Sequence, residues 1–412
     1  MKKCRAALMA IPLSLGMSFA VVGLVAANHE IVIGFQCDRM GATQTIGVHL
    51  CPGYHDYIKL VNSKGGVMGH KIRVVEVDHE YKVPPAIESY ERFKKEGAVV
   101  IGVYGTAQIY ALTQKLTEDR IPGTSPGFGK AAAADGARYP YIFPIAATYY
   151  SQATAAVKFV QDQLGSLKGK KIAYIFGDVP AGREPIPVLE ELAPREGFQL
   201  KLFAVPLPGI EMGAQVLDVV RRYRADFVIA HLGGRSPSVS IREFKRVGYP
   251  LRKVISFVWG ASEADIDAAG GYGVAEGYYG LQFAGVGQDF AVLKEIRAMY
   301  EKEGKPTPKE MASTVFYNRG VLIAALHVEA IRNALKAKPD GKITGGDVKN
   351  GFEHIKGFTL GGLVPPLEIT PTDHEGGGLV QVWQVKGGKW VKVTDWFKAY
   401  PEVVAKAMKE AK

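Results

Sequence analysis

The sequence predicts an α/β protein built as two doubly wound lobes, each with a parallel sheet covered by helices. Short β-branched runs alternate with stretches of helical spacing along most of the chain. Such strand–helix–strand units require right-handed crossovers and give parallel sheets with helices on both faces. The chain has 412 residues, which is too long for one typical core and comfortable for two.

The first residues have the pattern of an export signal. Three basic residues occur among the first five, an apolar run covers 6–25, and Ala26 and Ala27 precede Asn28. We therefore expect cleavage after Ala27 and a periplasmic protein, and we exclude residues 1–27 from the fold. The alternative is an uncleaved anchor, because the apolar run approaches the ~20 residues that span a bilayer. No later segment of the sequence is long and apolar enough to span.

The charge pattern does not indicate a nucleic-acid partner. The formal net charge is +10, and removing the three basic residues of the signal leaves +7. The basic residues are dispersed, and even the densest cluster, 168–171, is shorter than the runs of five or six that mark nucleic-acid arms. We interpret them as solvated surface.

Cysteine usage predicts one disulfide. Cys4 falls in the signal, which leaves Cys37 and Cys51 as an even pair in an exported protein. A metal site is the alternative, because we expect Cys51 at the start of the first helix, where His55 follows it by one helical turn and His49 lies nearby. These residues do not form a closed set of four ligands, so we expect no metal and no cofactor.

The order of expected elements indicates more than one crossing between the lobes. Strands are expected at 31–35, 72–77, 98–103, 172–176, 200–205, 226–230, 254–258 and 277–281. The helices between them include 152–164, 187–193 and 216–223. After these units come three helices with no strand between them, at 289–303, 313–335 and 346–354, and then a hairpin at 380–385 and 390–393.

Several motifs resemble the branched-chain amino acid type of periplasmic binding proteins. Residues 62–72 read Asn-Ser-Lys-Gly-Gly-Val-Met-Gly-His-Lys-Ile, followed by Val77-Asp78, and the family's segment is N-x-x-G-G-I-x-G-x-K-I…D. Val67 departs mildly from the family's isoleucine. Further matches at 100–102, 121–126 and 171–175 keep the family's order. The likeness extends from Ile31 to about Trp390.

The resemblance implies two lobes joined by three crossover strands, with a small-molecule solute held in the cleft between them. It also implies the membrane permease of an ABC transporter as partner, and we expect a monomer. The domain limits that we predict are 1–27 for the signal, 28–146 and 284–358 for lobe 1, and 147–283 and 359–412 for lobe 2.

In lobe 1 the candidate ligand-binding residues follow two neighbouring strands. Open parallel sheets expose loops and helix amino termini at the carboxyl ends of their strands. Tyr104, Gly105 and Thr106 come after one strand and before a helix, so their amides and the Thr106 hydroxyl can hold a carboxylate. Ser125, Gly127 and Phe128 follow the next strand. Plain strand-to-helix turns, with Thr106 as a helix cap, are the alternative.

In lobe 2 the candidates are three residues that follow strands and one that follows the first crossing. His231 and Arg235 belong to a strand end whose glycines allow close approach of a ligand, and Trp259 ends the next strand. Tyr149 lies just past the expected first crossover, where the family often places cleft residues. An aromatic side chain at such a position is also common in a core or on a plain surface.

The position of Trp259 argues against an amino-acid ligand. Amino-acid-binding relatives supply an acidic residue there, in a Gly-Pro-Glu-Gly-like turn, which pairs with the ligand's ammonium. A buried ammonium without that partner is costly unless another acid, such as Glu263, reaches in. We therefore favour an aromatic or other hydrophobic acid.

In this hypothesis the aromatic residues wall an apolar slot, and Thr106, Ser125, the amides near Gly127 and Arg235 hold the carboxylate. A branched-chain amino acid remains open, because Trp259 could hold its ammonium by a cation–π contact. A short amide also remains open.

Two other classes of function were weighed. Residues 123–127 spell the Gly-x-Ser-x-Gly of a hydrolase, but Pro126 lacks the N–H that such a site needs after its serine. The glycines of 271–277 miss the dinucleotide spacing, and there is no P-loop. We expect no enzyme. A ligand-sensing receptor domain is the other alternative, since similar two-lobed folds act as sensors.

Overall fold

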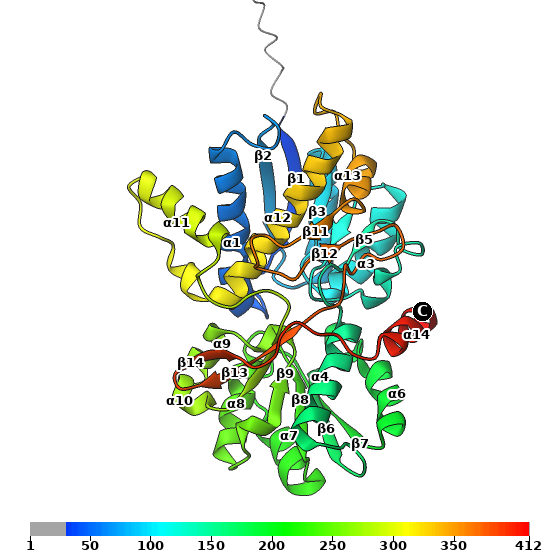
Figure 1. Ribbon diagram of the computed structural model, residues 1–412, viewed down its shortest axis with the longest axis vertical. Coiled ribbons are helices and arrows are strands. Elements are labelled where there is room, and N and C mark those ends of the chain that lie inside the picture. Colours follow the sequence, from blue (N-terminus) through cyan, green and yellow to red (C-terminus); the bar gives the residue numbers. More distant parts are fainter. Residues whose placement is uncertain (1–29, 412) are drawn as a thin grey trace, which may run out of the picture.

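The computed structural model describes residues 30–411, which form two lobes stacked along the long axis of the molecule (Figure 1). The first sheet has the order β2-β1-β3-β4-β5, and all its pairs are parallel. Its strands are β1 (Ile31–Cys37), β2 (Ile72–Asp78), β3 (Val100–Gly102), β4 (Gly123–Thr124) and β5 (Ile142–Phe143). All seven residues of β1 are buried, as expected of a central strand covered on both faces.

The second sheet has the order β14-β13-β10-β9-β8-β6-β7. Its parallel strands are β6 (Lys171–Gly177), β7 (Gln199–Val205), β8 (Phe227–His231), β9 (Val254–Ser256) and β10 (Tyr279–Gln282). The late hairpin of β13 (Gln381–Lys386) and β14 (Lys389–Lys392) adds antiparallel to β10. In each sheet the strand order reverses next to the strand that opens the lobe, which is where open α/β sheets form a binding crevice.

In both lobes, helices connect successive strands and cover the faces of the sheet (Figure 1). Lobe 1 carries α1 (Gln44–Ser63), α2 (Val83–Lys95), α3 (Thr106–Glu118), η1 (Ala131–Ala134), α11 (Ala291–Lys302), η5 (Lys309–Ala312), α12 (Thr314–Ala337) and α13 (Gly345–Phe352). Lobe 2 carries α4 (Tyr149–Leu164), α5 (Pro180–Arg183), α6 (Ile186–Glu196), α7 (Gly213–Leu217), η2 (Asp218–Tyr223), α8 (Ser236–Arg246), η3 (Leu251–Lys253), η4 (Val258–Gly260), α9 (Glu263–Ala268) and α10 (Tyr272–Ala275). The last helix, α14 (Pro401–Glu410), packs against α4, α6 and η1.

The structure confirms the predicted α/β class with parallel sheets, and most expected elements lie within a few residues of their predicted positions. One boundary was wrong. We expected Cys51 at the start of the first helix, but α1 begins at Gln44 and continues through Pro52. The helix packs along its length against α12, and this burial outweighs the one hydrogen bond that a proline removes.

The chain passes between the lobes three times, after β5, after β10 and before β13. The predicted domain limits remain a proposal, with one change at the third crossing. Residues 359–375 were assigned to lobe 2, but β12 (Leu367–Glu368) pairs with β11 (Lys356–Phe358), and the His374 ring stacks on Phe143 of the first sheet with centroids 3.9 Å apart. We therefore place that crossing near Gly378.

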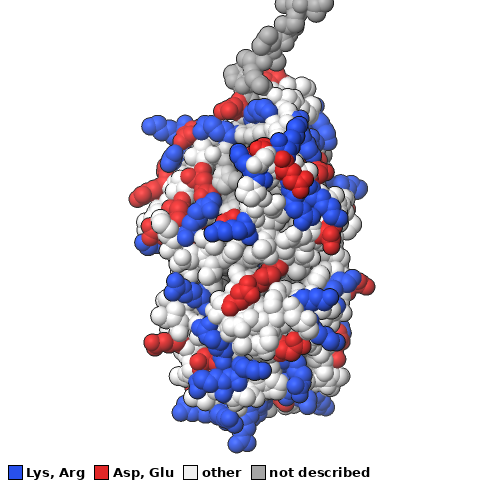
Figure 2. Space-filling model, turned by 90° about the vertical axis from the view of Figure 1, so that its left-hand side faces the viewer, with Lys and Arg blue, Asp and Glu red and all other residues white. Residues whose placement is uncertain are grey.

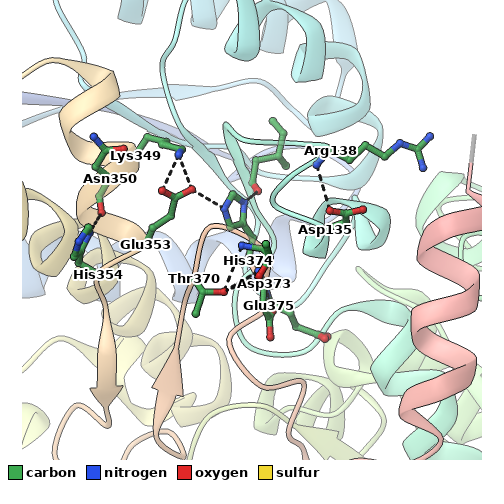
Figure 3. Close-up of polar contacts among 12 residues, drawn as sticks. Asp135, Arg138, Lys349, Asn350, Glu353, His354, Thr370, Asp373, His374 and Glu375 are labelled. Atoms are coloured by element: carbon green, nitrogen blue, oxygen red, sulfur yellow. Dashed lines mark hydrogen bonds and ion pairs between the residues drawn. The ribbon is translucent and has the colours of Figure 1, made fainter.

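A buried polar cluster holds the third crossing in place (Figure 3). Glu353 lies between Lys349 and His374, with its carboxylate 2.7 Å from the lysine Nζ and 3.2 Å from the imidazole Nε2. One residue further on, the Glu375 carboxylate accepts a hydrogen bond from the backbone N–H of Thr148 at 2.6 Å. Thr148 caps α4, so the third crossing is bonded to the first.

Charged side chains of both signs are interspersed over much of the face shown in Figure 2, with a largely uncharged band between the lobes. Basic side chains gather at the lower end of this face. None of the helices within residues 30–411 combines the length and the hydropathy needed to cross a bilayer. The predicted signal, residues 1–27, lies outside the described residues.

Candidate ligand-binding cleft

A cavity lies between the two lobes and is lined by residues of both, and interfaces between domains are a common place for small-molecule sites. Lobe 1 contributes residues that follow β1, β2, β3 and β4, and lobe 2 contributes the start of α4 and residues at or after the ends of β6, β7, β8 and β9. The lining residues are Thr43, Ile46, Tyr81, Tyr104, Gly105, Thr106, Phe128, Tyr149, Gly177, Val179, Ala181, Gly182, Leu207, His231, Leu232, Gly233 and Trp259.

The lobe 1 wall is fixed by two buried side chains behind it. Asp38, directly after β1, accepts hydrogen bonds from the backbone N–H and the hydroxyl of Thr43 at 2.7 and 2.6 Å. The Nδ1 atom of His79 accepts from the Tyr81 N–H at 2.9 Å, so Nε2 carries the proton and donates to the Tyr104 carbonyl at 2.9 Å. His79 therefore sets the positions of two lining tyrosines.

The start of α3 offers hydrogen-bond donors beside the cavity. Gly105, the N-cap residue, has φ +113°, and no side chain caps the helix. A Cβ at Gly105 would lie 2.1 Å from the Gln108 side-chain oxygen, so only glycine fits there. Gln108 is fully buried, and within residues 30–411 neither its amide oxygen nor its nitrogen has a hydrogen-bond partner. Open helix N–H groups and an unpartnered amide thus lie together.

The lobe 2 wall is built around His231 and Trp259. The His231 ring, at the end of β8, packs between the Tyr149 and Phe257 rings at 4.3 and 4.6 Å. Burial lowers the pKa of His231 to about 3, so the ring is neutral at physiological pH. The Trp259 indole N–H donates to the Gly127 carbonyl of lobe 1 at 2.9 Å, and its ring lies 5.1 Å from Phe128.

Behind Trp259 lies Arg319 of α12, a fully buried arginine. Its guanidinium donates to the Val258 carbonyl at 2.6 Å and to the Gln282 side-chain oxygen. It also lies 4.8 Å from the Trp259 ring and 4.6 Å from the Phe283 ring. Burial lowers its pKa to about 9, although nearby acidic groups oppose that shift. Arg319 supports the tryptophan from the side away from the cavity lining.

The cavity wall carries no formal charge. None of the described residues that line it is Asp, Glu, Lys or Arg, and its histidine is neutral. Glu263, the acid that we considered as an ammonium partner, instead accepts from the Thr314 hydroxyl and from the Val315 N–H at 3.1 Å, at the start of α12. Burial raises its pKa. An ammonium in this cavity has no carboxylate lining it.

Glu184 is the buried acid that joins the lobes next to the cavity. From lobe 2, its Oε1 atom accepts from the Tyr110 hydroxyl and, at 2.9 Å, from the Ala131 N–H of lobe 1. Its Oε2 atom has no partner within residues 30–411. Burial raises the pKa of Glu184 to about 7. The carboxyl group therefore titrates in the physiological range while it bridges the lobes.

Seven of the ten residues predicted to bind a ligand line the cavity: Tyr104, Gly105, Thr106, Phe128, Tyr149, His231 and Trp259. Ser125, Gly127 and Arg235 do not. The backbone N–H groups of Ser125 and Gly127 are already bonded to the carbonyls of residues 143 and 145, so they cannot hold a carboxylate. Arg235 is the N-cap residue of α8 and its side chain is exposed.

Several lining residues were not predicted from the sequence. Tyr81 is the most informative, because its backbone is left-handed, with φ +60°, and strained conformations of this kind concentrate at functional sites. Its hydroxyl has no hydrogen-bond partner among the described residues. The sequence carries no signal for this conformation. Thr43 was findable in principle, since it follows the first strand and precedes α1, as Thr106 does for α3.

Cys37 and Cys51 form a disulfide with Cα atoms 6.4 Å apart, which is the pairing that the sequence predicted. Both residues are fully buried. The bond joins the end of β1 to α1 directly beside the Asp38–Thr43 contact. Glu76 lies near the two sulfur atoms, but sulfurs in a disulfide are not thiolate ligands, and Glu76 is paired with Arg39 and His55.

Comparison with known proteins places the chain in a family. Residues 30–389 match the family model described as "Periplasmic binding protein". A "Leu/Ile/Val-binding protein homolog 7" of Brucella suis is 24% identical over 351 residues, covering 79% of this chain and 85% of that protein. The chain belongs to the periplasmic binding protein family, as the sequence motifs predicted.

Solved structures of similar proteins share the fold. One from the Pseudomonas fluorescens group, described as an ABC transporter permease, has a TM-score of 0.82 and 32% identity over 92% of this chain and 95% of that chain. A branched-chain amino acid ABC transporter protein from Thermus thermophilus with bound valine gives 0.79 at 22% identity, covering 92% and 98%. A fatty acid ABC transporter substrate-binding protein from Thermomonospora curvata gives 0.76 at 19%, covering 91% and 94%.

Proposed function

We propose that this protein is the periplasmic solute-binding component of an ABC importer, and that its solute is a small carboxylate with an aromatic or other hydrophobic body. Family membership supports the carrier role, and the uncharged, aromatic-walled cavity between the lobes supports the solute class. The protein holds its ligand and catalyses no reaction. Its partner is the membrane permease of the transporter.

The cavity wall is the observation that carries the choice of solute. Phe128, Tyr104, Tyr149 and Trp259 give large apolar surfaces on both sides of the cleft, and such rings contribute most of the binding energy in apolar sites. An amino acid would bring an ammonium that no lining carboxylate neutralises. Burial of an unpaired charge is costly, so the matching carboxylic acid without the amino group is favoured.

The start of α3 is the best support for a carboxylate anchor. The first N–H groups of a helix have no partner within the helix, and the helix dipole favours an anion there. Thr106, which lines the cavity, adds a hydroxyl, and behind it the buried Gln108 amide has no partner among residues 30–411. Ser125, the Gly127 amide and Arg235 do not line the cavity. In our proposal the start of α3 therefore replaces them as the group that holds the carboxylate.

An amino-acid solute is the principal alternative. The Thermus thermophilus relative holds valine, and the Brucella suis relative is named for leucine, isoleucine and valine. The Thermomonospora curvata relative is named for a fatty acid, a carboxylate without an ammonium. These relatives are at most 24% identical to this chain, so their ligands do not decide between an amino acid and a hydrophobic acid. We base that choice on the chemistry of the cleft.

A thermal-shift panel tests the solute class. It compares aromatic acids, aliphatic acids, branched-chain amino acids and short amides, each at the same concentration. A ligand at 100 times its Kd stabilises the folded protein by about 2.7 kcal/mol, so a true solute raises the melting temperature by several degrees. We expect the hydrophobic acids to do so. Stabilisation by leucine or valine, with no shift from any acid, contradicts the proposal.

Export is tested separately. Mass spectrometry of protein recovered from the periplasm should give a chain that begins at Asn28, because the signal pattern ends with Ala27. Recovery of the full-length chain in the membrane fraction would show an uncleaved anchor instead.

A further inference from the structure

The surroundings of His231 determine which of its two ring nitrogens carries the proton. One of them, Nδ1, lies 3.0 Å from the Tyr174 hydroxyl. The same hydroxyl donates to the Gly182 carbonyl at 2.9 Å. A tyrosine hydroxyl has one hydrogen, and a carbonyl can only accept. Both contacts are hydrogen bonds only if His231 Nδ1 carries a proton and donates it to Tyr174.

The other ring nitrogen of His231, Nε2, is therefore a hydrogen-bond acceptor. The ring is neutral, because burial holds its pKa far below physiological pH, and a neutral imidazole with a proton on Nδ1 has a bare lone pair on Nε2. Within residues 30–411, His231 has a hydrogen bond at Nδ1 and none at Nε2, and the residue lines the cavity. The Nε2 lone pair is therefore available to water or to a solute in the cleft.

Two places in the cleft thus have fixed and opposite hydrogen-bonding roles. The N–H groups at the start of α3, in lobe 1, can only donate, whereas His231 Nε2, in lobe 2, can only accept. The hydroxyls of Tyr81 and Tyr149, which also line the cavity, can do either. A ligand that spans α3 and His231 therefore needs an acceptor at one end and a donor at the other.

We propose that the solute carries a neutral hydrogen-bond donor, a hydroxyl or an amide N–H, that meets His231 Nε2 while its carboxylate meets the start of α3. This inference rests on the proposed function and narrows its solute class to hydroxylated or amide-bearing hydrophobic acids. An ammonium does not fit equally well, because one neutral acceptor satisfies a single N–H and leaves the charge unpaired.

Matched ligands test the donor requirement by calorimetry. The 3- and 4-hydroxyphenylacetates are compared with their methoxy ethers, which keep the oxygen and lose the donor. The same comparison is made with the neutral primary amides of these acids. The better hydroxyl isomer should bind about tenfold more tightly than its ether, because a site built for a donor rejects the analogue that lacks it. Equal affinities overturn the inference.

A variant tests the role of Tyr174 as a positioning residue. Tyr174→Phe removes the hydroxyl that holds the proton on Nδ1, so the imidazole is free to place it on Nε2 and the preference for hydroxyl over ether should shrink severalfold. Tyr278→Phe is the matched control, because Tyr278 is also fully buried in lobe 2 and donates to a carbonyl, that of Gly260, at 3.0 Å. The control should keep the full preference, and an equal loss in both variants overturns the inference.

The proton on His231 is measured directly in the unliganded wild-type protein by ¹H–¹⁵N NMR of the imidazole nitrogens, which needs neither a ligand nor a variant. A neutral ring with Nδ1 protonated supports the inference, and a proton on Nε2 overturns it. If the amides bind with the hydroxyl preference and no acid binds, the donor inference stands while the proposed carboxylate solute fails.

Discussion

The cavity wall and the layer directly behind it contrast in charge. The cavity wall is uncharged and rich in aromatic rings, whereas the layer behind it contains the buried Arg319 and Glu184 and the partly buried Glu263, all bonded across the lobes. The charges hold the lobes and the aromatic rings in position, and the wall is left to apolar contact and neutral hydrogen bonds. The difference supports our proposal that a carboxylate ligand is held by backbone dipoles and not by a counter-ion.

The largest effect is expected from removing the arginine behind the wall. Arg319→Ala leaves the Val258 and Gln282 acceptors without donors and opens a space beside three aromatic rings, so the free energy of unfolding should fall by about 4 kcal/mol. Arg332→Ala is the control, since Arg332 lies on the same helix in a partly exposed ion pair with Glu329 and should cost less than about 1 kcal/mol. Urea denaturation measures both, and similar losses would show that Arg319 has no special role.

The disulfide should contribute nearly as much. Cys37 and Cys51 close a loop with a sequence separation of 14, for which chain entropy gives about 3 kcal/mol. The double variant Cys37→Ala, Cys51→Ala should be less stable by that amount in urea denaturation. Its stability should be the same with and without reductant, while that of the wild type should fall in reductant. If the stability of the wild type were unchanged after complete reduction, the disulfide would not contribute to the stability of the fold.

A substitution in the cavity wall should weaken ligand binding more than it lowers the stability of the fold. Phe128→Ala removes the ring that lies 5.1 Å from Trp259 and 6.2 Å from Tyr104, and affinity for 3-phenylpropionate should fall about tenfold in calorimetry. Phe203→Ala in β7 is the control, because Phe203 is similarly buried and does not line the cavity. An unchanged affinity in Phe128→Ala would place the ligand elsewhere.

The smallest effect is a pH dependence that comes from Glu184. The groups around it are Tyr110 of α3, Lys130 before η1, Tyr149 and Tyr150 of α4, and Tyr174 of β6. Burial between the lobes raises its pKa from 4.5 to about 7, so closure favours the protonated form. That contribution is complete below the ordinary pKa and is lost as pH rises through about 7.

Affinity for 3-phenylpropionate, whose own carboxyl stays ionised in this range, should therefore fall severalfold from pH 5.5 to pH 8, with about 25-fold as the limit if opening of the lobes returns the Glu184 carboxyl fully to its ordinary pKa. Glu184→Gln should abolish the dependence, and Glu190→Gln, which changes an exposed acid of α6, should keep it. A dependence that survives in Glu184→Gln belongs to another group.

The alternation of strands and helices was sufficient to predict the fold class, because periodicity is a local property of the chain. The same reasoning selected Thr106 and His231, which lie at strand ends where parallel sheets expose their loops, and both line the cavity. It also selected Arg235, whose side chain is exposed at the start of α8 and does not line the cavity. The amides near Gly127 do not line it either, because their N–H groups continue the sheet's hydrogen bonding.

The layer behind the wall was not predicted at all, although one signal was present. Arg319 is the single charged residue between Thr314 and Val328, in the otherwise uncharged first part of a long helix, and a lone charge in such a run is a candidate for a buried, bonded role. Tyr81 gave no signal, because its left-handed backbone is set by Asp78 and His79 contacts that form only in the folded lobe.

The most direct test of the central claim is calorimetry with two pairs of ligands that differ only by an α-ammonium. The pairs are 3-(4-hydroxyphenyl)propionate with L-tyrosine and 3-(3-hydroxyphenyl)propionate with L-meta-tyrosine, so the body of the ligand is the same within each pair and every ligand keeps a hydroxyl donor. Because the wall has no carboxylate for an ammonium, the deaminated acid should bind at least about a hundredfold more tightly than its amino acid in the pair whose body fits. Tighter binding of either amino acid, or no binding of either acid, would contradict the account.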